Sequence, residues 1–118
     1  MSPATAAVGT APLWRVGRCE DVPLLEGRSV DVAGRRIAIF NLGDGFAAID
    51  AECPHRRGPL ADGLVAEGCV TCPLHDWRVD LRTGEVVGAD EPGVHCYEVI
   101  ERGGDLLLRI DHRNGIER

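Results

Sequence analysis

The stretch CPHRRGPLADGLVAEGCVTCPLHDW, residues 53–77, decides both the fold and the chemistry of this chain. It contains two short groups, Cys53–Pro54–His55 and Cys72–Pro73–Leu74–His75, with sixteen residues between the first histidine and the second cysteine. Each group offers one thiolate and one imidazole, and each cysteine precedes a proline, whose fixed φ stiffens the loop. Stiff loops that each present two ligands indicate a preorganised metal site. The candidate ligands are Cys53, His55, Cys72 and His75.

Two kinds of metal centre use two cysteines and two histidines. One is a single tetrahedral zinc ion, and the other is a [2Fe–2S] cluster with both cysteines on one iron and both histidines on the other. A zinc finger usually pairs cysteine with cysteine and presents its histidines from a helix. Here each group mixes the two residue types, and residues 72–75 have no helical pattern, so the spacing favours the cluster. A zinc-binding structural module is the alternative, and it predicts a colourless protein.

Alternating apolar and polar residues on both sides of this stretch predict antiparallel strands. The expected outer strands are Leu13–Val16, Arg28–Val32, Arg36–Leu42, Phe46–Asp50, Val94–Ile100 and Asp105–Ile110. Four shorter strands are expected between them, at Gly63–Ala66, Cys69–Cys72, Arg78–Asp80 and Glu85–Val87. Turn signals at Ala33–Gly34 and Gly103–Gly104 fit hairpins. The sequence therefore predicts an all-β fold, an antiparallel barrel or sandwich with a small loop-rich, cluster-binding subdomain at about residues 51–90.

Length and composition limit the remaining possibilities. The 118 residues fit one small domain at 12–110, with a disordered leader at 1–11 and a polar tail at 111–118. A net charge of −6 argues against nucleic acid as a partner, because a phosphate backbone needs a basic face. No apolar run reaches the length of a membrane span. An odd number of cysteines, five, fits metal binding better than a disulfide framework, and a cytoplasmic location is expected.

Residues 53–60 and 72–77 resemble the two cluster-binding loops of Rieske proteins. The resemblance extends from about Trp14 to Leu108, since the flanking strands also suit that family. It implies a Rieske iron–sulfur fold in which the two cysteines hold the inner iron and the two histidines hold the outer, more exposed iron. A Rieske-type [2Fe–2S] cluster is therefore the expected cofactor.

A finer resemblance concerns the run Cys72–Val99, which is similar to the small subunit of assimilatory NAD(P)H nitrite reductases. It implies an electron-transfer subunit without catalytic residues of its own. Its partner would be a large flavin and siroheme subunit that reduces nitrite to ammonium. Rieske ferredoxins of aromatic-ring dioxygenases more often carry Trp or Phe before the second histidine and Gly after it, where this chain has Leu74 and Asp76. A free ferredoxin that serves a ring-hydroxylating oxygenase is the alternative function.

The neighbours of the four ligands predict a low reduction potential. High-potential Rieske proteins carry a disulfide between the two loops, and the positions that it needs are Gly58 and Leu74 here. They also place a hydroxyl two residues after the second histidine, where this chain has Trp77. Hydrogen bonds to the cluster sulfurs raise the potential, so we expect a value near the low end of the Rieske range, about −150 mV.

Three cysteines and one tryptophan are left for structural roles. Cys19, Cys69 and Cys96 are expected to be small buried hydrophobic residues rather than ligands. In an extended strand Cys69 would face away from Cys72, because the two are three residues apart. Trp77 is expected to pack beneath the second loop.

Overall fold

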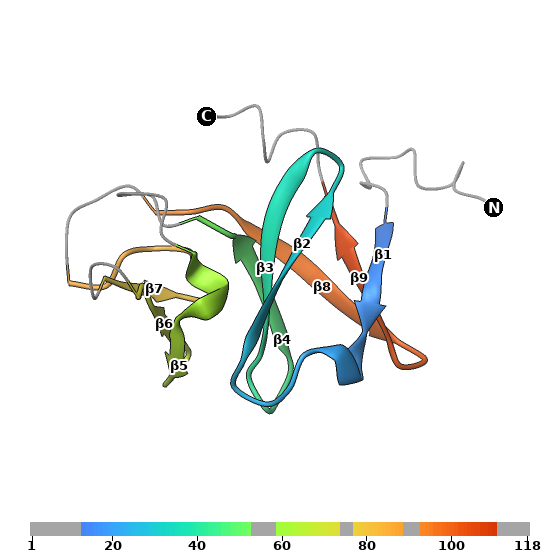
Figure 1. The fold of residues 1–118 in the computed structure, drawn as a ribbon, viewed down its shortest axis with the longest axis horizontal. Coiled ribbons are helices and arrows are strands. Elements are labelled where there is room, and N and C mark those ends of the chain that lie inside the picture. The colour runs from blue at the N-terminus through green and yellow to red at the C-terminus, as the bar shows by residue number, and fades with distance from the viewer. Residues whose placement is uncertain (1–12, 53–58, 74–76, 89–92, 111–118) are drawn as a thin grey trace.

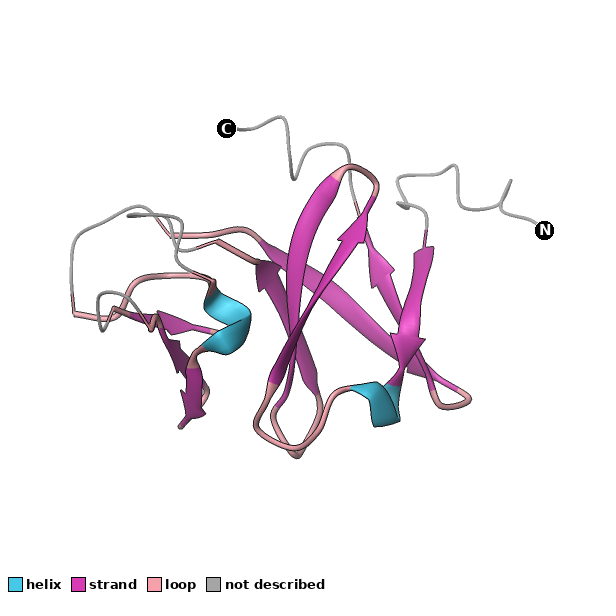
Figure 2. Cartoon of the chain, in the orientation of Figure 1, coloured by secondary structure: helices cyan, strands magenta, loops and turns pink. Residues whose placement is uncertain are grey.

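Strands account for nearly all of the regular structure in this chain. The computed structural model describes residues 13–52, 59–73, 77–88 and 93–110, and the account below refers to these. Two 3-10 turns, η2 (Cys19–Asp21) and η3 (Leu60–Asp62), interrupt the strands (Figure 2). The strands are β1 (Leu13–Arg18), β2 (Gly27–Val32), β3 (Arg35–Asn41), β4 (Phe46–Asp50), β5 (Leu64–Ala66), β6 (Cys69–Thr71), β7 (Arg78–Asp80), β8 (Cys96–Arg102) and β9 (Asp105–Arg109). The predicted all-β class is confirmed.

Six strands form one antiparallel sheet in the order β1-β9-β8-β4-β3-β2. Its two edge strands, β1 and β2, come into contact, so the sheet curls into a nearly closed barrel (Figure 1). The predicted meander of β2, β3 and β4 is confirmed, with Gly27 opposite Phe40 and Asn41 opposite Phe46. Ala33 and Gly34 both have positive φ, 53° and 78°, as a tight hairpin turn requires.

The remaining three strands form a small sheet, β5-β6-β7, beside the barrel (Figure 1). Three of the four short strands predicted here are present, but the expected strand Glu85–Val87 is wrong, because it is reduced to one bridge between Val86 and Val79. The carboxylate of Asp80 accepts hydrogen bonds from the backbone N–H groups of Arg82 and Thr83. These bonds start a turn directly after β7. Gly84 then adopts a φ of +81°, and the residues after it pair with β7 through only two backbone hydrogen bonds, Asp80 N–H to the Glu85 carbonyl and Val87 N–H to the Arg78 carbonyl, both 2.8 Å.

The core has two parts. One lies inside the barrel and contains Val22, Val32, Ile37, Ile39, Ala48, Tyr97, Leu106, Leu108 and Ile110. The other lies between the barrel and the small sheet and is called the shared core here. It contains Ala38, Phe40, Ile49, Ala51, Leu60, Ala61, Val70, Cys72, Val79 and Leu81. Strand β3 supplies alternate residues to the two parts because neighbouring side chains of a strand point to opposite faces.

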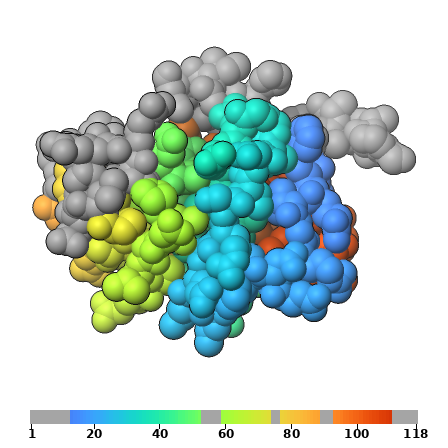
Figure 3. Space-filling view, viewed as in Figure 1, coloured from blue at the N-terminus to red at the C-terminus, as the bar shows by residue number. Residues whose placement is uncertain are grey.

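Gly27 lets the small sheet come close to the barrel. A Cβ at this position would lie 2.6 Å from the ring of Phe40 and 2.8 Å from the carbonyl oxygen of Ala61. The turn η3 therefore packs directly on β2, and the surfaces of the two segments are continuous in the space-filling view (Figure 3). Any larger residue at Gly27 would force the two parts of the molecule apart.

The predicted leader, 1–11, and the predicted tail, 111–118, lie outside the described residues. Within the described ranges, no helix has the length and apolar character needed to cross a membrane. The described strands next to these segments in the sequence are β1 and β9, which pair from Leu13 opposite Arg109 to Arg18 opposite Asp105.

Candidate metal centre

Cys72 is the one predicted ligand that falls among the described residues. It follows directly after β6 and is completely buried. Its backbone N–H donates a hydrogen bond of 2.7 Å to the carbonyl oxygen of Trp77, which closes the base of the predicted second loop. The other three predicted ligands lie outside the described residues: Cys53, His55 and His75.

The predicted first loop is closed at its base in a similar way. The N–H of Leu60 donates to the carbonyl oxygen of Ala51 at 2.8 Å, and Glu52 forms an antiparallel bridge with Pro59. These contacts bracket residues 53–58, which contain two of the predicted ligands. The ends of both predicted loops are therefore held by backbone hydrogen bonds.

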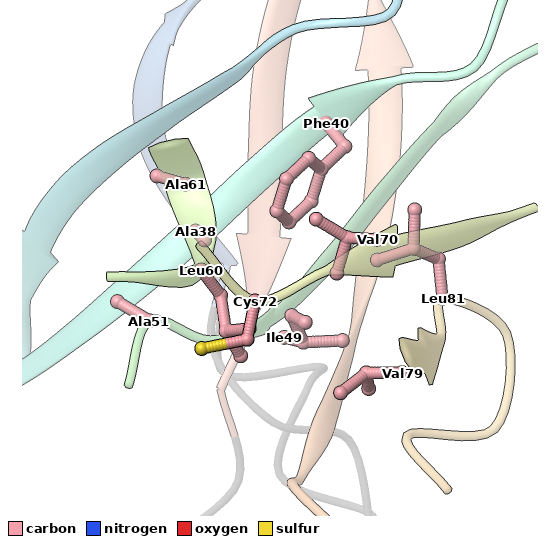
Figure 4. Packing of buried hydrophobic residues seen from close by; sticks show 10 residues of the cluster. All are labelled: Ala38, Phe40, Ile49, Ala51, Leu60, Ala61, Val70, Cys72, Val79 and Leu81. Carbon is pink, nitrogen blue, oxygen red and sulfur yellow. The ribbon is translucent and has the colours of Figure 1, made fainter. Parts of the chain in front are cut away.

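The bases of the two loops meet in the shared core. Ala51, Leu60 and Cys72 belong to the same buried group, and Figure 4 shows the Cys72 sulfur directed toward the side of Ala51 and Leu60. Ala51 is two residues before the predicted ligand Cys53. The described residues thus bring the base of the first loop beside the one ligand of the second loop that is described.

The surroundings of Cys72 fit a cluster ligand. Its neighbours are apolar side chains such as Ile49 and Leu60, and a thiolate in such a place needs a metal to balance its charge. The predicted donor set of two thiolates and two imidazoles matches the Rieske type of [2Fe–2S] centre. Trp77 packs against the shared core and is partly buried, so its expected packing role is confirmed.

Asp50 joins two segments that flank this region, and sequence reasoning missed it. Its Oδ1 accepts a hydrogen bond of 2.7 Å from the Tyr97 hydroxyl, and its Oδ2 accepts one of 3.0 Å from the backbone N–H of His95. The backbone N–H of Asp50 also donates to the carbonyl oxygen of His95 at 3.0 Å. An acidic residue at the inner end of an apolar strand, three positions before a predicted ligand, is the signal that could have drawn attention to it.

Burial and charge near Asp50 change the titration of two side chains. The pKa of Tyr97 is raised above its ordinary value of 10.0, mainly by burial and then by its hydrogen bond to Asp50, while Arg35 acts in the opposite direction. The pKa of the Cys96 thiol is also raised, first by burial and then by the charges of Asp80 and Asp50. Both side chains therefore hold their protons to a higher pH than they would in water.

The three cysteines assigned no metal differ in burial. Cys69 is buried, as predicted, and lies outside the buried group that contains Cys72. Cys19 and Cys96 are only partly buried, so the expectation of full burial is wrong for both. Cys19 packs at the margin of the barrel core, and Cys96 packs at the margin of the shared core.

Comparison with known proteins points to one family. The family described as Rieske [2Fe-2S] domain matches residues 13–98. The methanesulfonate monooxygenase ferredoxin subunit of Methylosulfonomonas methylovora is 39% identical over 82 residues, which are 69% of this chain and 67% of that subunit. The 3-phenylpropionate/cinnamic acid dioxygenase ferredoxin subunit of Escherichia coli (strain K12) is 35% identical over 93 residues, covering 76% of this chain and 86% of that subunit.

Solved structures of two kinds share the fold. The ferredoxin of carbazole 1,9a-dioxygenase from Nocardioides aromaticivorans IC177 has a TM-score of 0.79 at 28% identity, covering 86% of this chain and all of that one. A candidate NADH-dependent nitrite reductase small subunit from Mycobacterium tuberculosis has the same TM-score at 18% identity, covering 86% of this chain and 97% of that one. The second likeness shows the fold alone.

Proposed function

Because the chain belongs to the Rieske [2Fe-2S] domain family, we propose that it is a ferredoxin that delivers electrons to an oxygenase. Its cofactor is a Rieske-type [2Fe–2S] cluster, and its general role is that of an electron carrier within an oxidoreductase system. When bound, such a cluster accepts and donates one electron at a time. The identity of the electron acceptor is the proposed part of this function.

One observation supports an oxygenase as the acceptor. The methanesulfonate monooxygenase ferredoxin subunit is 39% identical to this chain, and dioxygenase ferredoxin subunits are 35% identical. Among the solved structures, the ferredoxin of carbazole 1,9a-dioxygenase is 28% identical to this chain, and the nitrite reductase small subunits are 18% identical. The resemblance of Cys72–Val99 favours a nitrite reductase subunit. These comparisons instead favour the alternative function, a ferredoxin that serves an oxygenase.

The proposed ligands are Cys53 and Cys72 for one iron and His55 and His75 for the other. Cys72 fits this role because its side chain is fully buried in the shared core and its backbone is held by Trp77. Apolar residues around the thiolate exclude water, which limits the reorganisation of solvent when the charge of the site changes. We expect a midpoint potential of about −150 mV, which a redox titration would test.

A nitrite reductase small subunit is the second candidate. The run Cys72–Val99 resembles that family, and two solved small subunits share the fold with TM-scores of 0.77 and 0.79. In this case the partner would be a large subunit with flavin and siroheme. Both candidates require the same bound cluster, so they differ in the protein that oxidises it.

The experiment that separates them measures electron transfer to each kind of acceptor. The chain is reduced with dithionite, freed of excess reductant and mixed anaerobically with an oxygenase component or with a siroheme nitrite reductase subunit. We expect the visible spectrum of the oxidised cluster to return at least about tenfold faster with the oxygenase, the ratio given by about 1.4 kcal/mol in activation free energy. Faster oxidation by the siroheme subunit would contradict the proposal and support the second candidate. The reduced chain without an acceptor is the control.

A further inference from the structure

We propose that Asp50 is a positioning residue for the cluster, acting through its hydrogen bonds to Tyr97 and to the backbone of His95. The proposal rests on the assignment of Cys53 as a ligand, but it does not depend on which protein accepts the electron. The sequence does not reveal the contact between Asp50 and Tyr97, because the two residues are 47 positions apart.

Both oxygens of the Asp50 carboxylate accept hydrogen bonds from the segment 95–97. The Tyr97 hydroxyl binds Oδ1 at 2.7 Å and the His95 N–H binds Oδ2 at 3.0 Å, while the Asp50 N–H donates to the His95 carbonyl. Three hydrogen bonds therefore connect the last residue of β4 to residues 95–97. This segment brings the chain back into the barrel after the cluster-binding region.

Strand β3 holds the backbone of Asp50 and Ala51 on the side opposite to β8. Asp50 lies opposite Ile37 on β3, and the N–H of Ala51 donates to the carbonyl oxygen of Arg36 at 3.1 Å. Ala51 then packs in the shared core with Cys72. A displacement of Asp50 would thus move the backbone two residues before Cys53 and the packing of Cys72 together.

The Tyr97 side chain gives this connection its rigidity. Only 5% of Tyr97 is exposed, and it is part of the barrel core, so its hydroxyl has a fixed place. A hydrogen bond from a hydroxyl to an ionised carboxylate is about twice as strong as one between neutral groups. Asp50 is therefore tied to the interior of the barrel rather than to a mobile surface group.

The test uses two variants that remove parts of the connection. Tyr97→Phe removes only the hydroxyl and keeps the ring, while Asp50→Asn replaces one acceptor oxygen by an amide donor that faces an N–H or an O–H. The first measurement is the rate of cluster loss from the full chain in the presence of an iron chelator, followed by visible absorption. We expect each variant to lose the cluster about tenfold faster than the original chain, as for one lost hydrogen bond to a charged group.

Asn41 offers a matched control. It is the last residue of β3, whereas Asp50 pairs with Ile37 near the start of that strand. Its side chain also bridges two segments, donating to the Val22 carbonyl and accepting from the Gly43 N–H, both at 2.9 Å. Asn41→Ala should lower the thermal midpoint without changing the rate of cluster loss at a temperature well below that midpoint. If Tyr97→Phe and Asn41→Ala accelerate cluster loss in the same proportion to their loss of stability, Asp50 has only a structural role and the proposal is overturned.

A second measurement detects changes in the site itself. Tyr97→Phe leaves the carboxylate in place, so a changed midpoint potential in this variant would report altered positions of the ligands. We expect a twofold change in the ratio of reduced to oxidised protein at a fixed solution potential, about 18 mV for a one-electron couple. The double variant should lose the cluster no faster than Asp50→Asn alone, because both changes break one unit. An unchanged potential together with additive rates would overturn the proposal.

Discussion

The barrel and the small sheet are both antiparallel, but they are stabilised in different ways. The barrel strands have five to seven residues, and apart from β4 and β8, which pair at two positions, neighbouring strands pair along most of their length. Each strand of the small sheet has three residues. Strands this short are marginal on their own. The small sheet therefore depends on the shared core, to which β3 contributes Ala38 and Phe40, and on the closed loop bases. The difference indicates a self-supporting frame that carries a dependent cluster-binding part.

Loss of the cluster should have the largest effect, and only on the dependent part. Cys72→Ser removes a proposed ligand, so we expect the visible absorption of the cluster to disappear. Amide hydrogen exchange should then become faster in β5, β6 and β7, while the barrel strands stay protected, because the metal stabilises only the part it binds. Hydrogen exchange with mass spectrometry would measure this.

Cys69→Ser is the control for that experiment. Cys69 is also buried and lies three residues earlier, at the start of β6, but it belongs to no predicted ligand set. This variant should keep the cluster and its spectrum. Loss of the cluster in both variants would mean that either cysteine substitution unfolds the small sheet, and the ligand role of Cys72 would lose its support.

Truncation of core leucines compares the two regions directly. Leu108 lies in the barrel core and Leu60 in the shared core, and both are fully buried. Replacement of either by alanine should lower the free energy of unfolding by about 2–5 kcal/mol. In Leu108→Ala, cluster loss and barrel unfolding should coincide in a urea titration. In Leu60→Ala, the visible absorption should fall at lower urea than the circular dichroism of the strands. Coincident transitions in both variants would contradict the division into frame and dependent part.

Alanine substitutions at two glycines with the same φ distinguish the cost of steric crowding from the cost of a left-handed backbone conformation. Gly84 and Gly88 both have a φ of +81°, but a Cβ on Gly84 would collide with the carbonyl oxygen of Val94, whereas a Cβ on Gly88 would meet none of the described residues within 4 Å. Gly88→Ala should cost about 1–2 kcal/mol for the left-handed backbone alone. Gly84→Ala should cost about 1–3 kcal/mol more, because the crowded backbone must move. Chemical denaturation would measure both, and equal losses would show that the contact between Gly84 and Val94 can relax freely.

Alkaline pH should weaken the barrel through Tyr97. Because the pKa of Tyr97 is raised in the folded chain, the folded state keeps a proton that the unfolded state releases above its ordinary value of 10.0. This stabilisation is fully present below pH 10 and is lost as the pH rises toward the folded pKa. The free energy of unfolding should therefore fall by about 1.4 kcal/mol per pH unit above 10 from this residue. Tyr97→Phe should lack this part of the slope, and an identical slope in both chains would contradict the assignment.

Local signals were sufficient for the frame but not for its long-range contacts. The meander of β2, β3 and β4 follows from alternating residues and from the turn at Ala33–Gly34, both of which act over a few positions. The strand expected at Glu85–Val87 failed because the side chain of Asp80 binds the following backbone, a local competition that the alternation does not show. The hydrogen bond between Asp50 and Tyr97 depends on how β4 and β8 align, which no short pattern encodes.

The type of metal centre could be predicted because its candidate ligands lie close together in the sequence. The spacing of cysteines and histidines was enough to expect a Rieske-type cluster, as the family match confirms, whereas the four individual ligands stay a prediction. The acceptor was harder to predict, because recognition of another protein depends on a surface formed by both proteins and not on the spacing of a few adjacent residues.

The pairing of β1 with β9 has a consequence for how the chain folds. Leu13 lies opposite Arg109, so the first of the described strands pairs with the last of them. Contacts between such distant positions slow folding, since a long loop must close before they form. During synthesis β1 therefore waits as an unpaired strand until β9 appears, and the barrel closes only after the cluster-binding region has been made. Incorporation of iron and sulfur would then compete in time with closure of the barrel around the shared core.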